Sequence, residues 1–217
     1  MGRAISLGLA KNGVKVALTG RNQSLLDKTA KEIEEAGGNA KTFLLDVTDD
    51  RQAESVSKEV YEEWGSIDIL VNNAGVIVYD KPVWETTLEE WNFIMDTNLK
   101  GTFLTCKAVL PYMMQKGAGY IINMGSSSGK EPDDEYGPYA ASKWGVVGYT
   151  ASLAKSLIGQ GIIVNGINPT WVDTDMARAY IPEGDPDWVT QNEISDAVIY
   201  LLTKAPKAMT GKFIDIF

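Results

Sequence analysis

The sequence predicts an α/β fold, a doubly wound parallel sheet with helices on both faces, in a single domain. Apolar runs with strand character alternate with amphipathic helical patterns from one end of the chain to the other. Repeated strand–helix–strand units of this length favour a parallel sheet. With 217 residues, 44% of them hydrophobic, the chain can bury one compact core. We therefore expect residues 1–217 to form one domain.

The first half of the chain contains three strand-like runs, at residues 14–18, 42–45 and 67–71. The helical pattern between the first two runs has apolar residues that share one face, namely Leu25, Leu26, Ala30 and Ile33. Gly37 and Gly38 are typical of a left-handed cap that ends this helix. The next helix is predicted from a three- and four-residue repeat formed by Ala53, Val56, Val60 and Trp64. The run at 67–71 is continuously apolar, so we expect a strand that is buried on both faces.

The second half of the chain continues the alternation with longer helices. One helical pattern covers roughly residues 88–116, and another, rich in small residues, covers residues 139–158. Further elements are expected as strands at 120–124 and 162–167, a shorter helix near 193–203 and a last strand near 212–216. Residues 177–192 are acidic and contain two prolines, so we expect them to form a loop that covers the substrate.

Charge and residue counts exclude several classes of function. The chain carries 20 basic and 29 acidic residues, a net charge of −9, which argues against a nucleic-acid or anionic-membrane partner. It has no histidine, which excludes the usual imidazole base and histidine-containing metal sites, and we expect no metal. The single cysteine indicates a reducing compartment, and no apolar stretch is long enough for a bilayer. We expect a cytoplasmic protein.

Ligands of parallel α/β sheets bind beyond the carboxyl ends of the strands, so the segments after the strands form the candidate site. These segments are rich in Gly, Asn, Ser, Thr and Asp and lie at residues 19–21, 46–47, 72–75, 125–129 and 168–174. Turns use the same residue types, so each segment taken alone is more typical of a turn.

Tyr139 and Lys143 are the first candidates for acid–base chemistry. They lie four residues apart near the start of a predicted helix, so their side chains share a face. A nearby ammonium favours the phenolate and lowers the pKa of a tyrosine from its usual value of about 10. Ser126 precedes Tyr139 by thirteen residues and could donate a hydrogen bond to a substrate carbonyl, with an ordinary turn serine as the alternative. Asn98 lies inside the long helix, where the alternative is a residue that bends it.

Five short motifs follow one another in order: Asn72-Asn73-Ala74-Gly75, Asn98, Gly125-Ser126, Tyr139-x-x-x-Lys143 and Asn168-Pro169. Together they resemble the short-chain dehydrogenase/reductase family, and they span nearly the whole chain. The resemblance implies a Rossmann-type domain that binds NAD or NADP and an Asn–Ser–Tyr–Lys catalytic tetrad. By this resemblance Tyr139 would be the general acid in carbonyl reduction and the base in alcohol oxidation, and Lys143 would lower its pKa and bind the nicotinamide ribose. Ser126 would polarise the carbonyl, and Asn98 would hold a water that links the lysine to solvent.

The resemblance also implies the residues that hold the cofactor. Gly2 resembles the last glycine of the phosphate-binding turn, and the position about 20 residues beyond that turn, where an acid usually stands, has Arg21 instead. A forked guanidinium suits a 2′-phosphate, so we predict NADP over NAD; a solvated arginine on a turn is the alternative. The remaining cofactor contacts are expected from Asp46, Val47, Asn72, Ala74, Gly75, Tyr139, Lys143, Pro169 and Thr174.

Two departures from the family pattern bear on cofactor binding. The family opens with a β-strand and a glycine-rich turn, whereas this sequence starts at Met1-Gly2-Arg3, in what resembles the end of that turn. Loss of this central strand would leave backbone groups of its neighbours unpaired, so either the sequence is clipped or this version binds cofactor poorly. In addition, Thr170 stands where the family usually has glycine, and it is expected to narrow the nicotinamide site.

We therefore expect an NADP-dependent oxidoreductase that transfers hydride between the cofactor and a small carbonyl or secondary alcohol, such as a 3-oxoacyl thioester, a sugar or polyol, or a small ketone. The alternative is a non-catalytic relative of the same fold with a cofactor-sensing or structural role. Members of the family commonly pair two long helices into dimers and tetramers. The large apolar residues on these helices are expected to form an interface in a homo-oligomer, and the alternative is that they are ordinary core residues. They are Trp91, Phe93, Met95, Phe103, Leu104, Trp144, Val147 and Tyr149.

Overall fold

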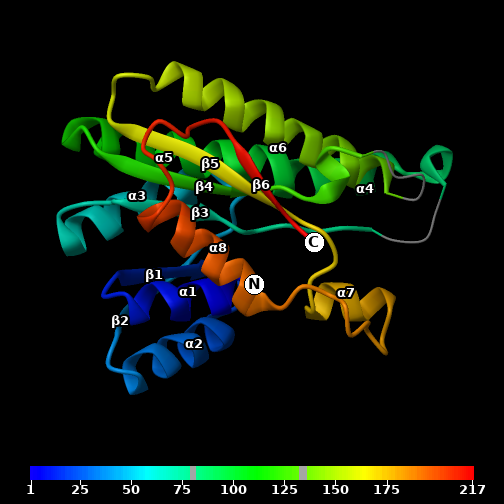
Figure 1. Cartoon of the computed structure of the whole chain (residues 1–217), viewed down its shortest axis with the longest axis horizontal. Helices are drawn as coiled ribbons and strands as arrows, with labels where there is room; N and C mark the ends of the chain where they lie inside the picture. The colour runs from blue at the N-terminus through cyan, green and yellow to red at the C-terminus, as the bar shows by residue number, and fades with distance from the viewer. Residues whose placement is uncertain (79–81, 132–135) are drawn as a thin grey trace.

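The computed structural model describes residues 1–78, 82–131 and 136–217, and its strands form a parallel sheet that is divided in two (Figure 1). The smaller part pairs β1 with β2, and the larger part has the strand order β3-β4-β5-β6. The strands are β1 (Lys15–Gly20), β2 (Asn39–Leu44), β3 (Ile69–Asn72), β4 (Gly119–Met124), β5 (Ile162–Pro169) and β6 (Phe213–Ile216). Every neighbouring pair is parallel. The predicted fold class is confirmed, and the sheet is divided between β1 and β3.

Helices cover both faces of the sheet. One face carries α1 (Gly2–Lys11), α2 (Gln23–Glu35) and α8 (Gln191–Thr203). The other face carries α3 (Asp50–Trp64), α5 (Gly101–Lys116) and α6 (Gly137–Ser156). Successive residues of β4 show the division, because Ile122 packs in the core of the first face and Ile121 in the core of the second.

Hydrogen-bonded caps fix where several helices begin. The Asp49 side chain accepts hydrogen bonds from two backbone N–H groups at the start of α3. Thr87 and Glu90 form a capping box at the start of α4 (Leu88–Met95), and Thr190 and Glu193 form another at the start of α8. Such caps satisfy N–H groups that the first helical turn leaves unpaired. They set the start of three helices that pack around the sheet.

The helical pattern at 88–116 is correct in extent but not uniform. A π-helical turn, Asp96–Lys100, joins α4 to α5 without a break in the helix. Asn98 lies inside this turn and is buried. A π turn inserts one residue per turn and is not visible in hydrophobic periodicity over such a short span. Leu104, which is a candidate for an exposed apolar face, is a buried core residue.

Two predicted details of the first half are wrong. Leu25 is 62% exposed, and the buried face of α2 consists of Leu26, Thr29 and Ile33. The helix covers only the narrow pair β1–β2, so its buried stripe is narrower than the apolar pattern suggests. The run at 67–71 does contain β3, but residues 69–71 are only half-buried. The edge of β3 that faces β1 has no neighbouring strand, which leaves these residues partly accessible.

Residues 177–192 are not a plain loop. They include most of α7 (Asp175–Tyr180), and Val189 pairs with Val172 in an isolated parallel bridge. The hydrogen bonds of this bridge are donated by Asp173 N–H to the Val189 carbonyl and by Val189 N–H to the Trp171 carbonyl. The segment is therefore tied to the end of β5, which places it beside the carboxyl edge of the sheet.

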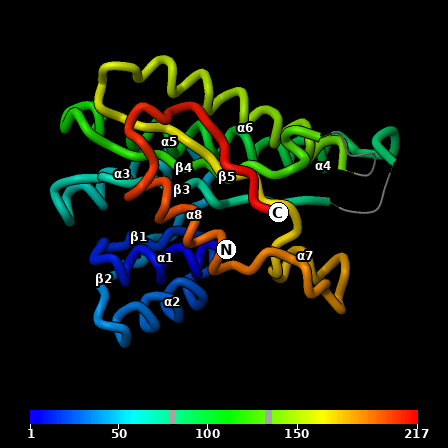
Figure 2. Tube along the Cα trace, viewed as in Figure 1, coloured from blue at the N-terminus to red at the C-terminus, as the bar shows by residue number. Residues whose placement is uncertain are grey.

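The start of the chain also lies at the carboxyl edge of the sheet (Figure 2). The Met1 amino group donates a hydrogen bond to Gln191 Oε1 over 2.9 Å, at the start of α8. The last strand ends nearby, where the Thr170 N–H donates to the Ile216 carbonyl over 3.0 Å. None of the helices in the described ranges is long and apolar enough to span a bilayer.

Candidate active site

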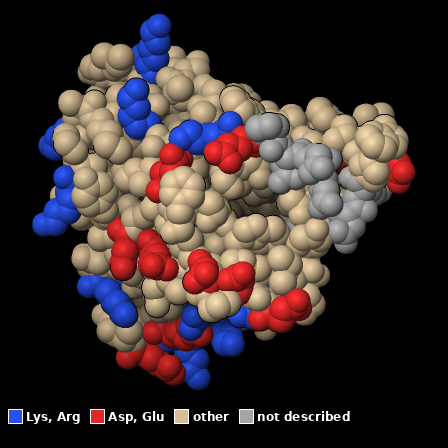
Figure 3. Space-filling model, turned by 45° about the vertical axis from the view of Figure 1, so that its right-hand side comes forward, with Lys and Arg blue, Asp and Glu red and all other residues tan. Residues whose placement is uncertain are grey.

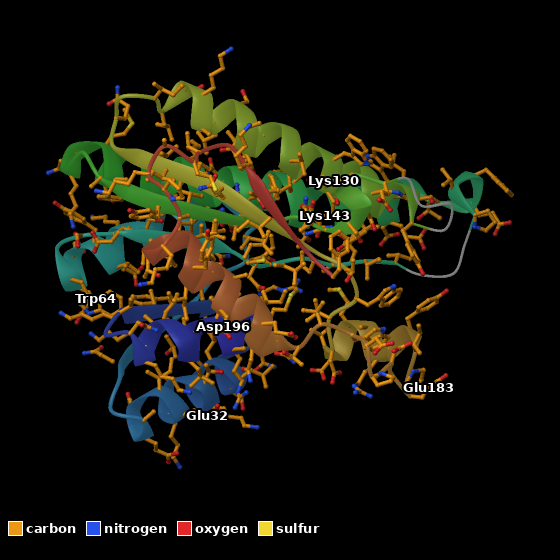
Figure 4. The ribbon with its side chains drawn as sticks, in the orientation of Figure 1. Glu32, Trp64, Lys130, Lys143, Glu183 and Asp196 are labelled. Atoms are coloured by element: carbon orange, nitrogen blue, oxygen red, sulfur yellow. The ribbon has the colours of Figure 1, made fainter. Side chains whose placement is uncertain are left out.

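The end of β4 and the first turns of α6 bring the predicted acid–base residues together. Lys143 Nζ donates a hydrogen bond to the Met124 carbonyl over 2.9 Å, and it lies 5.5 Å from the centre of the Tyr139 ring. The hydroxyl groups of Tyr139 and Ser126 are hydrogen-bonded to each other. Figure 4 shows Lys143 between α6 and the sheet. Three residues predicted from two separate motifs thus meet in one place.

Burial determines how Tyr139 and Lys143 titrate. Burial raises the pKa of the Tyr139 phenol, and the hydrogen bond with Ser126 opposes this shift. Burial lowers the pKa of the Lys143 amine to about 8. The expected lowering of the tyrosine pKa by the lysine is therefore not found in the protein alone. The phenol keeps its proton at neutral pH and is set up to donate it.

Asn98 positions the backbone beside Lys143. Its Oδ1 accepts a hydrogen bond from the Val76 N–H over 2.8 Å, and its Nδ2 donates to the Val76 carbonyl over 2.9 Å and to Ser142 Oγ over 3.0 Å. Both amide hydrogens are thereby used within the protein. A methyl group placed on Gly75 would lie 3.6 Å from Asn98 Oδ1 and 3.7 Å from Lys143 Nζ. The Asn98 side chain holds the segment after β3 against α6.

Two cavities meet at the carboxyl edge and contain most of the predicted cofactor residues. The first has a volume of about 980 Å³, and its lining includes Gly2, Arg21, Asp46, Val47, Asn72, Ala74 and Gly75. The second has a volume of about 170 Å³, and its lining includes Ser126, Tyr139, Lys143, Pro169 and Thr174. Both cavities are lined by Asn73 and Gly75, so together they form one elongated groove. Asn98 lies behind this groove.

Asn73 is not among the predicted cofactor contacts, but its side chain has an unpartnered oxygen at the groove, whereas the side chain of the predicted contact Asn72 is hydrogen-bonded within the protein. The Asn72 side chain is buried in a polar network, where its Oδ1 accepts from Thr105 and its Nδ2 donates to Asn123. Asn73 Oδ1 is buried without a hydrogen-bonding partner among the described residues, at the place where the cavities meet. Successive residues of a strand point to opposite faces. This alternation is the signal that separates the two asparagines once the strand end is known.

Arg21 and Asp46 lie at the far end of the groove. Hydrogen bonds from the Thr48 backbone and hydroxyl hold the pKa of Asp46 below its usual range, with a smaller contribution from the Arg21 charge. The Arg21 guanidinium is exposed and makes no hydrogen bond or ion pair with the residues that the structure describes. It is available for an anionic group of a ligand.

The groove fits a dinucleotide on the observations above. It is long, it is bordered by the glycine backbone at Gly75, and it holds one unpartnered amide oxygen at its centre. Gly2 also lies close to the groove, because a Cβ at this position would come within 2.9 Å of Asn73 Nδ2. The cationic side chain of Arg21 lies at one end of the groove, and the acid–base group of Tyr139 lies at the other.

Aromatic side chains form one wall of the smaller cavity. Trp171 is stacked between Tyr180 and Trp188, with ring centroids 5.8 and 5.5 Å apart. Tyr136 meets the edge of Tyr180 at 6.1 Å, and both Tyr136 and Trp171 line the cavity. This wall is not apparent from the sequence, since its members come from separate segments of the chain. Carboxylates are prominent on the surface at this side of the molecule (Figure 3).

Comparisons with known proteins agree with this geometry. A sequence profile of the family described as short chain dehydrogenase matches residues 1–184. The chain is 37% identical to the 3-oxoacyl-[acyl-carrier-protein] reductase FabG of Vibrio cholerae and 36% identical to that of Escherichia coli, and in both cases all of this chain and 91% of the relative are covered.

Solved structures give the same result. A variant of actinorhodin polyketide ketoreductase with NADPH superposes with a TM-score of 0.91 at 33% identity, covering 99% of this chain and 90% of the other. A gluconate 5-dehydrogenase from Burkholderia cenocepacia with NADP and tartrate gives a TM-score of 0.91 at 27% identity, covering 98% of this chain and 88% of the other.

Proposed function

The chain belongs to the short-chain dehydrogenase/reductase family of NAD(P)-dependent oxidoreductases, and we propose that it uses NADP(H) to reduce a small uncharged ketone or to oxidise the corresponding alcohol. The observation that carries this proposal is the hydroxyl pair of Tyr139 and Ser126, with Lys143 beside it, in the smaller cavity of the groove. Two hydroxyl donors that share a cavity can both reach one carbonyl oxygen.

Tyr139 acts as the general acid in the reduction. When bound, the nicotinamide would supply or accept the hydride, whereas the protein supplies the proton. Because burial raises the pKa of Tyr139, its hydroxyl is protonated at neutral pH and can give that proton to the carbonyl oxygen. Ser126 donates a hydrogen bond to the same oxygen as negative charge develops there. Lys143 is held by the Met124 carbonyl, and in its charged form it stabilises the phenolate left behind.

NADP is proposed over NAD because of Arg21. Its guanidinium is exposed at the end of the larger cavity and unpaired among the described residues. A 2′-phosphate offers it a planar, charge-assisted pair of hydrogen bonds, whereas ribose hydroxyls are better held by an acid. The structures with NADPH and NADP that resemble this chain support the same choice.

The proposed substrate carries apolar rather than anionic groups next to its carbonyl. Among the described residues that line the smaller cavity, Lys143 is the sole lysine or arginine, and its amine is already bound to the Met124 carbonyl. The wall formed by Tyr136 and Trp171 offers apolar contacts. Small ketones and 3-oxoacyl thioesters, the class named for the FabG relatives, meet this description. We further propose that the enzyme works in the cytoplasm, where the buried thiol of Cys106 stays unpaired.

Replacement of Tyr139 by phenylalanine tests the proposed function. Tyr139→Phe keeps the ring but removes the acidic proton, and we expect NADPH oxidation with a responsive ketone to fall by about a hundredfold or more. NADPH binding should change little. Tyr120→Phe is the matched control, because Tyr120 lies on β4 at the opposite end of the strand from Ser126. Unchanged turnover in Tyr139→Phe would refute the assignment, and NADPH binding without turnover of any carbonyl by the unaltered chain would favour a non-catalytic relative.

A further inference from the structure

The indole of Trp171 is enclosed on both faces by other rings. The Tyr180 ring lies 5.8 Å from it with an interplanar angle of 9°, and the Trp188 ring lies 5.5 Å from it with an angle of 12°. Three nearly parallel rings therefore form one stack with Trp171 in the middle. Tyr136 meets the edge of Tyr180, which joins the stack to the start of α6. An indole held between two rings cannot turn without displacing one of them.

The backbone explains why the two tryptophans meet. Val172 and Val189 are directly opposite each other in the isolated parallel bridge. Trp171 and Trp188 each come one residue earlier, and side chains at matching positions of parallel neighbours point to the same side. The bridge is closed by hydrogen bonds from Asp173 N–H to the Val189 carbonyl over 2.9 Å and from Val189 N–H to the Trp171 carbonyl over 3.0 Å. The backbone alone thus keeps the two tryptophans side by side.

An arginine folds the segment after α7 back toward this bridge. The Arg178 guanidinium donates to both carboxylate oxygens of Asp173, over 2.5 and 2.9 Å. It also donates to the carbonyls of Pro182 and Glu183, over 3.3 and 3.4 Å. A guanidinium that meets a carboxylate at two points has a fixed geometry. We therefore expect the segment to keep its fold when a single ring of the stack is replaced.

The smaller cavity is sensitive to the position of the Trp171 ring. Of the three stacked rings, Trp171 alone is among the described residues that line this cavity, where Tyr139 and Ser126 also lie. The cavity has a volume of about 170 Å³, a small multiple of the roughly 30 Å³ that one water molecule takes in the liquid. In an apolar pocket, one methylene group changes specificity by about tenfold or more. A ring in a fixed position therefore sets the width that a substituent of the ketone can have.

We propose that Trp188 is a positioning residue that sets substrate specificity, because it holds Trp171 in place and so confines the site to ketones that are unbranched next to the carbonyl. Trp188 acts through Trp171 and not by contact with the ketone, since it is absent from the described lining of both cavities. The inference rests on the proposed reduction of ketones and adds the class of substrate. With its outer face uncovered, the Trp171 indole turns outward and a branched substituent gains room.

The test compares the reduction of butanone and of methyl tert-butyl ketone with NADPH, since these ketones differ by two methyl groups next to the carbonyl. In Trp188→Leu, the ratio of kcat/KM for butanone to that for the branched ketone should fall by about tenfold or more. The value for butanone itself should change little. Trp188→Phe keeps a ring on the outer face of Trp171 and should keep the ratio. Trp84→Leu is the matched control, because Trp84 is 84% exposed in η1 (Val83–Glu85).

Two outcomes of this comparison would contradict the proposal. An unchanged ratio in Trp188→Leu would show that Trp188 does not control the width of the site. An equal fall in Trp188→Phe would show that aromatic stacking is not the cause.

A second readout does not need turnover. The aromatic proton signals of Trp171 in the NMR spectrum, assigned with Trp171→Phe, should shift in Trp188→Leu because the ring current over one face is lost. In a titration with methyl tert-butyl ketone that follows these signals, the dissociation constant should be lower by about tenfold or more in Trp188→Leu than in the unaltered chain. If the unaltered chain reduces neither ketone, the proposed function fails, and this titration still decides the role of Trp188. Equal dissociation constants in the two proteins would overturn that role.

Discussion

Lys143 is the residue whose chemistry depends most on its surroundings. Its amine is buried and donates a hydrogen bond to the Met124 carbonyl. Burial disfavours the charged ammonium, and it therefore lowers the pKa of Lys143 to about 8. A buried lysine that has no carboxylate partner among the described residues and lies next to a tyrosine and a serine is typical of a functional site rather than of a structural ion pair.

Replacement of Lys143 by methionine should stabilise the protein in a pH-dependent way. The folded-state pKa of about 8 lies below the usual value of 10.5, so the unfolded chain binds more protons between these values. Below pH 8 the free energy of unfolding of the variant should therefore be about 3 kcal/mol higher than that of the unaltered chain. This difference should shrink as the pH rises to 10.5. Thermal unfolding at several pH values measures it, with exposed Lys155→Met as the control. A difference independent of pH would contradict the lowered pKa.

Arg21 should decide between the two nicotinamide cofactors. Arg21→Asp replaces the partner of a 2′-phosphate by a partner of ribose hydroxyls, so the affinity for NADPH should fall by about tenfold or more while that for NADH is kept or improved. Binding titrations with both cofactors measure this change. Arg51→Ala is the control, because Arg51 is exposed on α3 and lines neither cavity. Equal losses for both cofactors would show that Arg21 does not select the phosphate.

At the residue scale, the sequence predicts which side chains form the acid–base pair, but it does not predict how their surroundings shift the pKa of the tyrosine. The four-residue spacing of Tyr139 and Lys143 is enough to place both on one face of α6, because helical geometry is local. The direction of the tyrosine pKa shift is not local: it depends on burial by segments far along the chain. The same is true of Asn73, whose unpartnered oxygen is apparent only when both cavities are known.

At the element scale, a buried polar network joins two strands to two helices. The network runs from Thr105 of α5 through Asn72 of β3 and Asn123 of β4 to Thr150 of α6, with distances of 2.6 to 2.8 Å. The side chains of this network are hydrogen-bonded to one another, which a low-dielectric interior requires of buried polar groups. The network fixes β3 and β4 against the helices that carry the π turn and the acid–base pair.

Replacement of Asn123 by leucine should destabilise the fold. Asn123 is fully buried, and its loss leaves Asn72 Nδ2 and Thr150 Oγ1 without this partner. Each unsatisfied buried group costs roughly 1–3 kcal/mol, so we expect a loss of about 3 kcal/mol in the free energy of unfolding. Urea denaturation measures it, with Asn39→Leu on the exposed start of β2 as the control. An equal loss of unfolding free energy in both variants would show that the buried network does not stabilise the fold.

Elements are predictable here where their signal is periodic and local. Alternating strands and helices, the left-handed Gly37 after α2, and the stripe of Ala53, Val56 and Val60 on α3 all follow from short-range patterns. The π turn at 96–100 and the bridge between Val172 and Val189 do not, because each depends on a contact between distant segments. The half-buried state of β3 likewise follows from a missing neighbour and not from its own sequence.

At the scale of the whole molecule, large apolar side chains are exposed on α4, α5 and α6. Four of them are 40% to 51% exposed: Trp91, Phe93, Phe103 and Trp144. Clusters of exposed large apolar residues are typical of interfaces between proteins. Of the residues that the sequence suggests for an interface between copies, Leu104 belongs to the core, whereas these four are exposed and can take part in an interface.

We expect these exposed side chains of α4, α5 and α6 to lie between copies of the chain. Sedimentation at micromolar concentration should show a species larger than the 23.7 kDa monomer, because a second copy would cover the four exposed side chains. The double variant Phe103→Glu and Trp144→Glu should sediment as a monomer, since it places charges among these side chains. Leu25→Glu, an exposed apolar position on α2, is the control. A monomer in all three proteins would contradict the expected assembly.

We propose that the groove from Arg21 to Tyr139 binds NADP(H) for redox chemistry, and a cofactor titration tests this proposal. The unaltered chain is titrated with NADPH and with NADH, and energy transfer from its six tryptophans to the reduced nicotinamide is recorded. We predict saturable binding of both, with a dissociation constant for NADPH lower by about tenfold or more. No saturation with either cofactor, or tighter binding of NADH, would contradict the account.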